Sequence, residues 1–267
     1  MPELAEVAYY GKKWDPGVNQ TVTRVHTHDS ARVFREFPAH KFQKLKGKRF
    51  KQHYHHGKQL LFQFEPNTWV GIHLGMTGKL TTAALEIVPA KSEHLIIFLD
   101  NVALVFSDYR MFGKCSIYDS EGFPEWWQSL PDALLSRKFS FTTFNQILER
   151  RNKTTLKGLL LDQKCFPGLG NWMVDEILWK ARIHPADSAQ WLNEEARRNL
   201  FDAIKKVSRT AMKTIGVDWT DPPSNWLFHK RWRDGNSCPK TGELLVREEI
   251  AGRTTCYSPI WQPSRKT

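Results

Sequence analysis

The apolar pattern of this chain changes near Gly122-Phe123-Pro124, and that change constrains its fold more than any other feature. Short apolar runs of strand length come before it: residues 60–64, 70–74, 95–99 and 102–106. Asp100-Asn101, between the last two runs, is typical of a tight hairpin turn. Residues 3–14 predict one leading helix, with Glu3 and Glu6 on one face. Several strands behind a single helix predict a β-sandwich.

Helical spacing of apolar residues takes over from about residue 130. The longest such stripe consists of Leu192, Ala196, Leu200, Ala203, Ile204, Val207 and Ala211. After about residue 226 the chain becomes β-like again, with Gly242 in a turn and residues 244–246 as a short strand. We therefore predict an α+β fold in three parts: an N-terminal β-sandwich over residues 1–128, a helical domain over 129–225 and a C-terminal β-hairpin over 226–267.

The charge of the chain indicates a polyanionic partner. Lys and Arg total 39 against 28 Asp and Glu, which gives a net charge of +11. Nucleic acid is the first expectation and a membrane surface the second, with ribonucleoprotein association as the alternative. No apolar run reaches the ~20 residues of a membrane span, and the N-terminus lacks a signal pattern. We expect a soluble monomer that is cytoplasmic or nucleoid-associated, or nuclear in a eukaryotic host, with its four cysteines as reduced thiols.

A loop rich in glycine and proline, Cys165 to Gly170, precedes a helix that Asn171 opens. Gly168 and Gly170 permit backbone geometries closed to other residues. A helix N-terminus presents N–H groups and a positive dipole end to an anion. In a protein of charge +11 that anion is plausibly a DNA phosphate. The alternative is an ordinary capped helix.

The N-terminus offers a nucleophile. Removal of Met1, which is efficient before proline, leaves Pro2 with a free secondary amine. An α-amino group has a pKa of about 7.7–8.0, so a useful fraction is neutral near pH 7. Attack of a secondary amine on an aldehyde-like carbon gives an iminium directly, and Glu3 beside it can move protons. The alternative is that Pro2 merely opens the first turn of a helix.

Taken in order, four motifs resemble those of the Fpg/Nei family, the bifunctional DNA glycosylases that remove oxidised bases. The similarity runs from Pro2 to Gln262, and although each motif is modest alone, their ordered coincidence is specific. The motifs are residues 2–7 (PELAEV), 73–80 (HLGMTGKL), 161–176 with Leu161-Asp162-Gln163, Gly168-Leu169-Gly170-Asn171 and Asp175-Glu176, and 252–255 (GRTT).

The resemblance implies a catalytic group on the first half of the chain. Pro2 would attack the sugar C1′ and form the iminium, with Glu3 as the proton shuttle and Glu6 as a second carboxylate that organises the site. Lys58 matches the family's hairpin lysine, which contacts phosphate near the lesion. A module that only binds damaged DNA would have no need of a proline amine. A tautomerase, which also uses N-terminal proline, would leave the charge and the phosphate loop unexplained.

The resemblance also implies five residues that bind DNA, which would be double-stranded and carry oxidised bases or abasic sites. An enzyme acting at C1′ must take the nucleotide out of the stack, and side chains then fill the hole. Met76 and Phe112 match the wedges, and Arg110 matches the arginine that faces the orphaned base. Asn171 of the helix–two-turn–helix motif and Arg253 at the hairpin tip match the family's phosphate ligands, which position DNA without reading its sequence.

The chain departs from the family at the C-terminal finger. Ala5, where proline is common, is a minor change. Most bacterial relatives hold the finger with a four-cysteine zinc site. Here the matching positions are Cys238, Thr241, Ser258 and Trp261, so one thiolate of four remains. Cys256 falls two residues before a ligand position, and we expect it to point away from the site. We therefore predict a zincless finger with no metal or other cofactor, packed around Tyr257, Ile260 and Trp261.

The lesion class is predicted from one short segment. Family members that favour oxidised purines usually carry a long loop between the helical motif and the finger. Residues 218–224 lead quickly into the finger here, and Met111 replaces a second arginine. Both features favour oxidised pyrimidines and hydantoins. The alternatives are an oxidised-purine (8-oxoguanine or formamidopyrimidine) glycosylase, and a non-catalytic relative that binds damaged DNA.

Overall fold

The computed structural model describes residues 1–265. The chain forms two compact units, one from Met1 to Leu130 and the other from Pro131 onward. The boundary expected from the sequence, after residue 128, lies two residues before this division. The predicted helical domain and hairpin lie together in the second unit.

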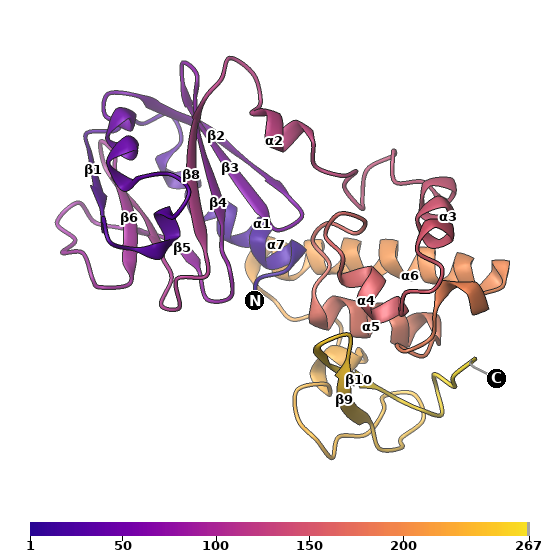
Figure 1. Cartoon of the computed structure of the whole chain (residues 1–267). Helices are drawn as coiled ribbons and strands as arrows, with labels where there is room; N and C mark the ends of the chain where they lie inside the picture. Colours follow the sequence, from indigo (N-terminus) through magenta and orange to yellow (C-terminus); the bar gives the residue numbers. More distant parts are fainter. Residues whose placement is uncertain (266–267) are drawn as a thin grey trace. The chain divides into compact units, whose positions relative to one another are not determined.

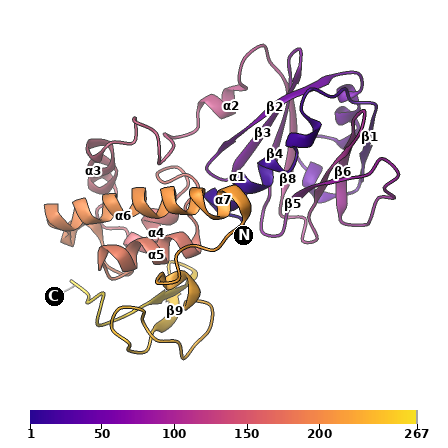
Figure 2. The same ribbon diagram turned by 180° about the vertical axis from the view of Figure 1, so that it is seen from behind.

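The first unit is a sandwich of two four-stranded antiparallel sheets, as predicted (Figures 1 and 2). Their orders are β1-β6-β7-β5 and β2-β3-β4-β8. The strands are β1 (Arg24–Thr27), β2 (Arg49–His56), β3 (Gln59–Glu65), β4 (Thr68–His73), β5 (Lys79–Ala83), β6 (Glu93–Phe98), β7 (Ala103–Ser107) and β8 (Lys114–Asp119). Alternate residues such as Leu60, Phe62 and Phe64 of β3 point into one apolar core shared by both sheets. The predicted turn at Asp100-Asn101 joins β6 to β7.

Helix α1 (Leu4–Lys12) packs against β2, β3 and β5. Its Gly11 is needed for this approach, because a Cβ there would lie 2.9 Å from the Leu60 side chain. Trp14 then enters the core and donates its indole N–H to the Thr81 carbonyl over 3.1 Å. The remaining helical segments of this unit are η1 (Asp15–Gly17), η2 (Arg32–Phe34), η3 (Ala39–Leu45) and α2 (Glu125–Gln128).

The second unit is built around a buried helix and a longer amphipathic helix that packs on it. Its elements are α3 (Phe141–Arg150), α4 (Leu156–Leu161), α5 (Asn171–Ala181), η4 (Ala189–Trp191), α6 (Glu194–Lys213), α7 (Ile215–Asp218), η5 (Leu227–His229), β9 (Val246–Ile250) and β10 (Arg253–Tyr257). The predicted apolar stripe is the buried face of α6, except that Leu192 precedes the helix. Nearly all of α5 is buried. Within residues 1–265, no helix is long and apolar enough to cross a membrane.

Two predictions for the C-terminal part were wrong. The strand expected at residues 244–246 begins only at Val246, because hydrogen bonds between Cys238 and both Gly242 and Glu243 hold the preceding turn. Ile260 is 57% exposed and fills no core. Trp261 does pack on an apolar cluster, whose members are Trp179, Leu227, Cys238, Leu245 and Cys256.

Candidate active site and nucleic-acid interface

Pro2, Glu3 and Glu6 lie at the start of α1. Glu3 is the N-cap and is buried, with 3% of its surface exposed. The Glu6 carboxylate accepts the Glu3 backbone N–H over 3.1 Å, and the two residues form a reciprocal capping box. Pro2 precedes the N-cap, so it does not occupy the first-turn position that a helix-opening role requires. The residue before it, Met1, is 48% exposed.

Lys58 lies in the two-residue turn between β2 and β3, where Gly57 takes a positive φ of 56°. The lysine is 92% buried. Beside it lies His73, the β4 partner of Gln59. Burial, together with the charges of Lys58, Arg35 and Lys114, lowers the pKa of His73 to about 4. The sequence analysis assigned no role to this histidine, although it opens one of the family motifs.

His73 is therefore a neutral hydrogen-bond donor near pH 7. Its Nδ1 accepts the Gly75 N–H over 3.1 Å, so the ring proton is on Nε2. A neutral Nε2–H beside the Lys58 ammonium can bind a phosphate oxygen.

Met76, Arg110 and Phe112 lie on two adjacent loops. Met76 is in the β4–β5 loop, whereas Arg110 and Phe112 are in the β7–β8 loop. The loops touch through their backbones, because a Cβ on Gly75 would lie 2.5 Å from atoms of Phe112 and Gly113. Met76 is 39% and Phe112 is 42% exposed, and the Arg110 guanidinium lies 4.7 Å from the Phe112 ring centre. Two exposed apolar side chains and an arginine thus extend from one loop pair.

Asp108 fastens these loops together. The residue is fully buried, and its carboxylate accepts the Thr77 hydroxyl over 2.5 Å and the Gly113 N–H over 2.6 Å. The Thr77 hydroxyl oxygen in turn accepts the Arg110 N–H over 3.2 Å. Asp108 lies in the same loop as Arg110 and Phe112, but its partner Thr77 is 31 residues away, so no local pattern indicates this role.

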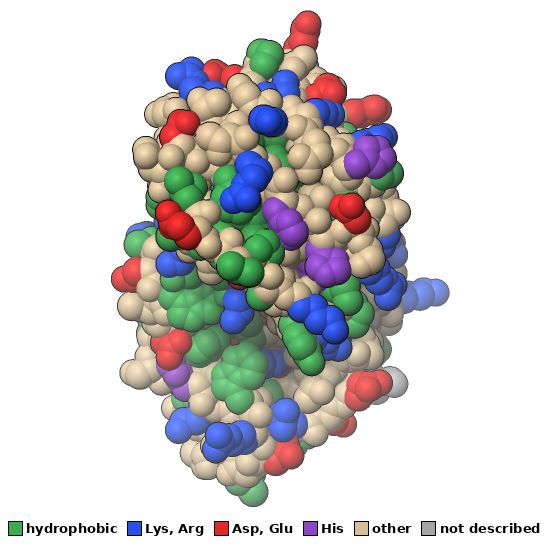
Figure 3. Space-filling view, turned by 90° about the vertical axis from the view of Figure 1, so that its left-hand side faces the viewer, with side chains coloured by type: hydrophobic (Ala, Val, Ile, Leu, Met, Phe, Trp, Pro, Cys, Tyr) green, Lys and Arg blue, Asp and Glu red, His purple; other side chains and the backbone are tan. Residues whose placement is uncertain are grey.

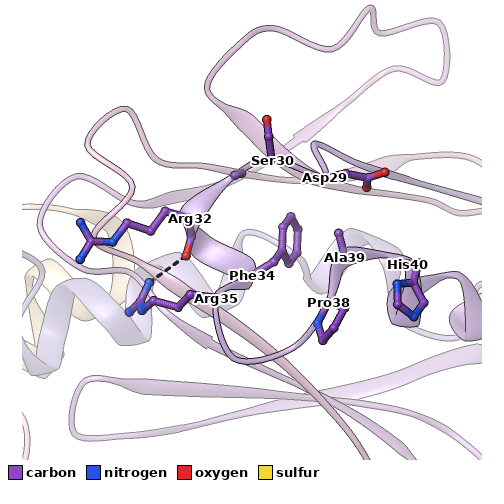
Figure 4. A pocket seen from close by; sticks show the side chains of 9 residues that line it. Asp29, Ser30, Arg32, Phe34, Arg35, Pro38, Ala39 and His40 are labelled. Carbon is purple, nitrogen blue, oxygen red and sulfur yellow. Dashed lines mark hydrogen bonds between the residues drawn. The ribbon is translucent and has the colours of Figure 1, made fainter.

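A pocket of about 410 Å³ lies next to this loop pair on the first unit (Figure 4). It is lined by residues of segment 29–40 and contains none of the predicted site residues. The Arg35 guanidinium donates to the Arg32 carbonyl over 3.2 Å, which Figure 4 marks, and to the Gly113 carbonyl over 2.6 Å. This segment therefore supports the loop that carries Phe112.

Asn171 begins α5 directly after the glycine-rich loop, as predicted. The Gln163 side chain organises that loop: its amide donates to the carbonyls of Leu161 and Leu169, and its oxygen accepts the Gly168 N–H over 3.0 Å. Gly168 has a φ of 94°, which favours glycine. The loop therefore has a fixed shape at a helix N-terminus, the arrangement that suits an anion.

Arg253 is exposed at the start of β10, next to the Ala251-Gly252 turn. Both turn residues have positive φ, the geometry of a type I′ hairpin. The neighbouring Thr254 carbonyl accepts the Asn171 side-chain amide over 2.8 Å. Asn171 and Arg253, the two predicted phosphate ligands of this unit, therefore lie on segments that a hydrogen bond joins.

The finger positions that match the family's zinc ligands make other contacts. Trp261 donates its indole N–H to the Trp179 carbonyl over 2.9 Å, and the Ser258 hydroxyl accepts the Trp261 N–H. Cys238 accepts the Trp179 indole N–H on its sulfur over 3.4 Å. No group of three or more His, Cys, Asp or Glu that could hold a metal occurs among residues 1–265. The donors present do not fit tetrahedral zinc, and the predicted lack of zinc awaits a measurement.

The orientation expected for Cys256 was wrong. Residues two apart on a strand share a face, so Cys256 points to the same side as position 258 and lies in the apolar cluster with Cys238. Burial raises the pKa of the Cys256 thiol to about 12. A protonated, buried thiol packs as a small apolar side chain.

On the face drawn in Figure 3 the charge is spread out: Lys and Arg side chains recur across it, with histidines and acidic groups between them.

Comparison with known proteins places the chain in a family. A profile of the formamidopyrimidine-DNA glycosylase N-terminal domain matches residues 1–115, and one of the helix–two-turn–helix domain of the same enzymes matches residues 130–220. The formamidopyrimidine-DNA glycosylase of Heliobacterium modesticaldum is 34% identical over 233 residues, covering 82% of this chain and 83% of the relative. An Arabidopsis thaliana protein of that name is 29% identical and covers 98% of this chain.

Solved structures agree. The Lactococcus lactis enzyme bound non-covalently to DNA with an AP site has a TM-score of 0.87 at 25% identity and covers 98% of this chain and 100% of its own. A mutant of that enzyme in complex with DNA containing Fapy-dG has a TM-score of 0.89 at 25% identity and the same coverage. The chain therefore belongs to the formamidopyrimidine-DNA glycosylase family.

Proposed function

We propose that this protein is a DNA glycosylase of base excision repair with AP lyase activity, and that Pro2 is its nucleophile. Its family consists of DNA glycosylases, and its relatives bind abasic and Fapy-dG DNA. The observation that carries the assignment to Pro2 is the capping box, which fixes the Glu3 carboxylate at the head of α1, one residue from the proline. The nitrogen becomes reactive only after Met1 is removed.

The chemistry follows from these groups. The Pro2 nitrogen loses its proton and forms a bond to C1′ as the glycosidic bond to the damaged base breaks, and the base leaves with a proton. The sugar ring then opens: the C1′–O4′ bond breaks as the nitrogen lone pair forms the C=N bond of the iminium, and O4′ takes a proton that Glu3 delivers. The resulting iminium makes a C2′ proton acidic, so removal of that proton expels the 3′ phosphate, and a second elimination expels the 5′ phosphate. Glu3 moves protons in these steps, and Glu6 holds the Glu3 backbone.

The DNA partner is a duplex with one nucleotide flipped out. Lys58 and His73 would bind phosphate on the first unit, and Asn171 and Arg253 on the second. Met76 and Phe112 would fill the gap in the stack, with Arg110 facing the orphaned base. A nucleoid or nuclear location follows from this partner.

Two lesion classes have support. The segment between α7 and η5 spans only residues 219–226, which favours oxidised pyrimidines and hydantoins because nothing long is present to cover a flipped purine. The names of the relatives and the Fapy-dG complexes favour oxidised purines. Excision from a panel of duplexes that carry one lesion each decides between them. Preference for a hydantoin or thymine glycol supports the first class, and preference for Fapy-dG or 8-oxoguanine supports the second.

Borohydride trapping tests the nucleophile. Wild-type protein whose mass shows loss of Met1 should crosslink to DNA with an abasic site or lesion, and Pro2→Gly should not. Glu3→Gln should bind the same DNA with impaired base release. Equal trapping by the wild type and Pro2→Gly would refute the role of Pro2. Binding without nicking by the wild type would support the non-catalytic alternative.

A further inference from the structure

A buried carboxylate, Asp175 of α5, connects the hairpin to the helices. Only 1% of the residue is exposed. Its Oδ1 accepts the Lys157 ammonium over 2.5 Å, and its Oδ2 accepts the Arg231 guanidinium through Nη2 at 2.7 Å and Nε at 3.1 Å. The same Oδ2 accepts the Cys256 backbone N–H over 3.1 Å. All of these partners are buried.

The donors come from three separate segments. Lys157 is on α4, Arg231 follows η5, and Cys256 is on β10. Lys157 also donates to the Asn171 backbone carbonyl over 3.2 Å. One carboxylate therefore joins the helix that begins at Asn171 to the strand that begins at Arg253.

The hydrogen bonds of this cluster are of a kind that can fix separate segments relative to one another. Charge-assisted and bidentate hydrogen bonds are the strongest and most directional that side chains make. A zinc site in the finger would hold the hairpin through a central cation and surrounding thiolates, for which the donors are missing here. This cluster inverts that arrangement, with a central anion held by two cations and one backbone N–H.

We propose that Asp175 and Arg231 are positioning residues for DNA binding. They fix the hairpin on α5 so that Asn171 and Arg253 can contact phosphates at the same time. This inference rests on the proposed function, because it takes Arg253 to be a phosphate ligand. The hydrogen bond from the Asn171 side-chain amide to the Thr254 carbonyl, over 2.8 Å, couples Asn171 to the segment that carries Arg253.

Arg231→Met is the best test variant. This substitution removes the contact between Arg231 and Asp175. The buried charge of Asp175 stays compensated by Lys157, so no unpaired charge is left in the interior. Asp175→Asn, in contrast, leaves Lys157 uncompensated and should destabilise the whole unit. Arg233→Met is the matched control, because this exposed arginine lies two residues away. Arg231→Lys keeps the charge but loses the pair of N–H groups that both donate to Oδ2.

The measurement is affinity for a duplex with an abasic-site analogue, taken over a range of salt concentrations. Arg231→Met should weaken binding by on the order of tenfold and lower the salt slope by about one phosphate, as Arg253→Ala does. The double variant Arg231→Met/Arg253→Ala should bind no more weakly than Arg253→Ala alone. Arg231→Lys should recover part of the affinity, Arg233→Met should match the wild type, and the trapping rate at saturating protein should not change.

Wild-type affinity for Arg231→Met, or a double variant whose loss is the sum of the single losses, would overturn the inference. If Arg253→Ala itself binds like the wild type, the proposed role of Arg253 fails, and that is a different result. Far-UV circular dichroism and melting confirm that each variant is folded. Should Arg231→Met not fold, the same cycle with Arg231→Lys decides the question.

Discussion

The side-chain amide of Asn171 donates a hydrogen bond to the backbone carbonyl of Thr254 over 2.8 Å. This contact uses one amide hydrogen and leaves the second for another acceptor. It joins the N-terminus of α5 to the residue next to Arg253, across 83 positions of sequence. Asn171, which we propose as a phosphate ligand, is therefore also a support of the hairpin.

Replacement of Asn171 should consequently cost more than one phosphate contact. We expect Asn171→Ala to weaken binding of abasic-site duplex by about 1–3 kcal/mol, roughly 5- to 150-fold, because a charge-assisted hydrogen bond and the hairpin support are lost together. The Asn171 amide carries no charge, so the slope of affinity against salt should fall only through the displaced Arg253, by no more than about one phosphate. Fluorescence anisotropy at several salt concentrations measures both. The exposed Asn152→Ala is the control, and equal affinity of the two variants would contradict the assignment.

Phe112 should matter only where a base must leave a duplex. Phe112→Ala removes a wedge, so excision of a lesion from duplex DNA should slow by roughly 10- to 100-fold, given the few kcal/mol of stacking lost at an unfilled gap. Cleavage of an abasic site in single-stranded DNA should change little. Single-turnover rates on the two substrates make the comparison. Tyr109→Ala changes a more exposed aromatic residue of the same loop, and an equal loss in that variant would indicate a general loop contact instead.

Loss of Asp108 should slow excision from duplex DNA as Phe112→Ala does, although Asp108 itself is buried. Asp108→Ala leaves the buried Gly113 N–H without its acceptor and releases Thr77 from the loop pair. We expect the protein to lose about 2–4 kcal/mol of unfolding free energy, within the range for a broken buried network. Duplex excision should fall while single-strand cleavage persists. Urea unfolding tests the first part, and an unchanged midpoint would show that the loops are held by other contacts.

Local patterns predicted most of the fold. Short apolar runs located the sandwich strands β3, β4, β6 and β7, and the stripe from Ala196 to Ala211 located α6. Local spacing also predicted that α5 begins at Asn171. These features depend on neighbours in sequence, which is why the sequence sufficed for them.

Contacts between distant segments could not be predicted in this way. Arg231 pairs with Asp175 across 56 positions, and nothing near either residue identifies its partner. The exposed Ile260 and the buried Cys256 show the same limit, because packing in the finger is set by Trp179 and Cys238 from other segments. Local hydrophobicity alone does not decide which side chain fills a small irregular core.

Acid should destabilise the protein partly through His73. Its pKa is about 4 in the folded chain and about 6.5 when unfolded, so the unfolded chain takes up the proton first as the pH falls. The stability that this residue contributes is complete above pH 6.5 and is lost between pH 6.5 and 4, by about 3 kcal/mol at most. His73→Gln should flatten that part of the unfolding curve, whereas the exposed His40→Gln should not. Denaturant unfolding from pH 4 to 8 measures the difference, and parallel curves for His73→Gln and the wild type would contradict it.

The C-terminal hairpin should fold and remain stable without zinc. Thr241, Ser258 and Trp261 occupy three of the four ligand positions, and the Cys256 thiol stays protonated because burial raises its pKa to about 12. Elemental analysis of the purified protein should find well under one zinc per chain. A chelator should leave both the melting temperature and borohydride trapping unchanged, because Asp175, Arg231 and Trp261 hold the hairpin instead. Cys256→Ala should only leave a small cavity, which lowers the unfolding free energy by roughly 1–2 kcal/mol. One zinc per chain, or a melting temperature that falls with chelator, would contradict this account of the finger.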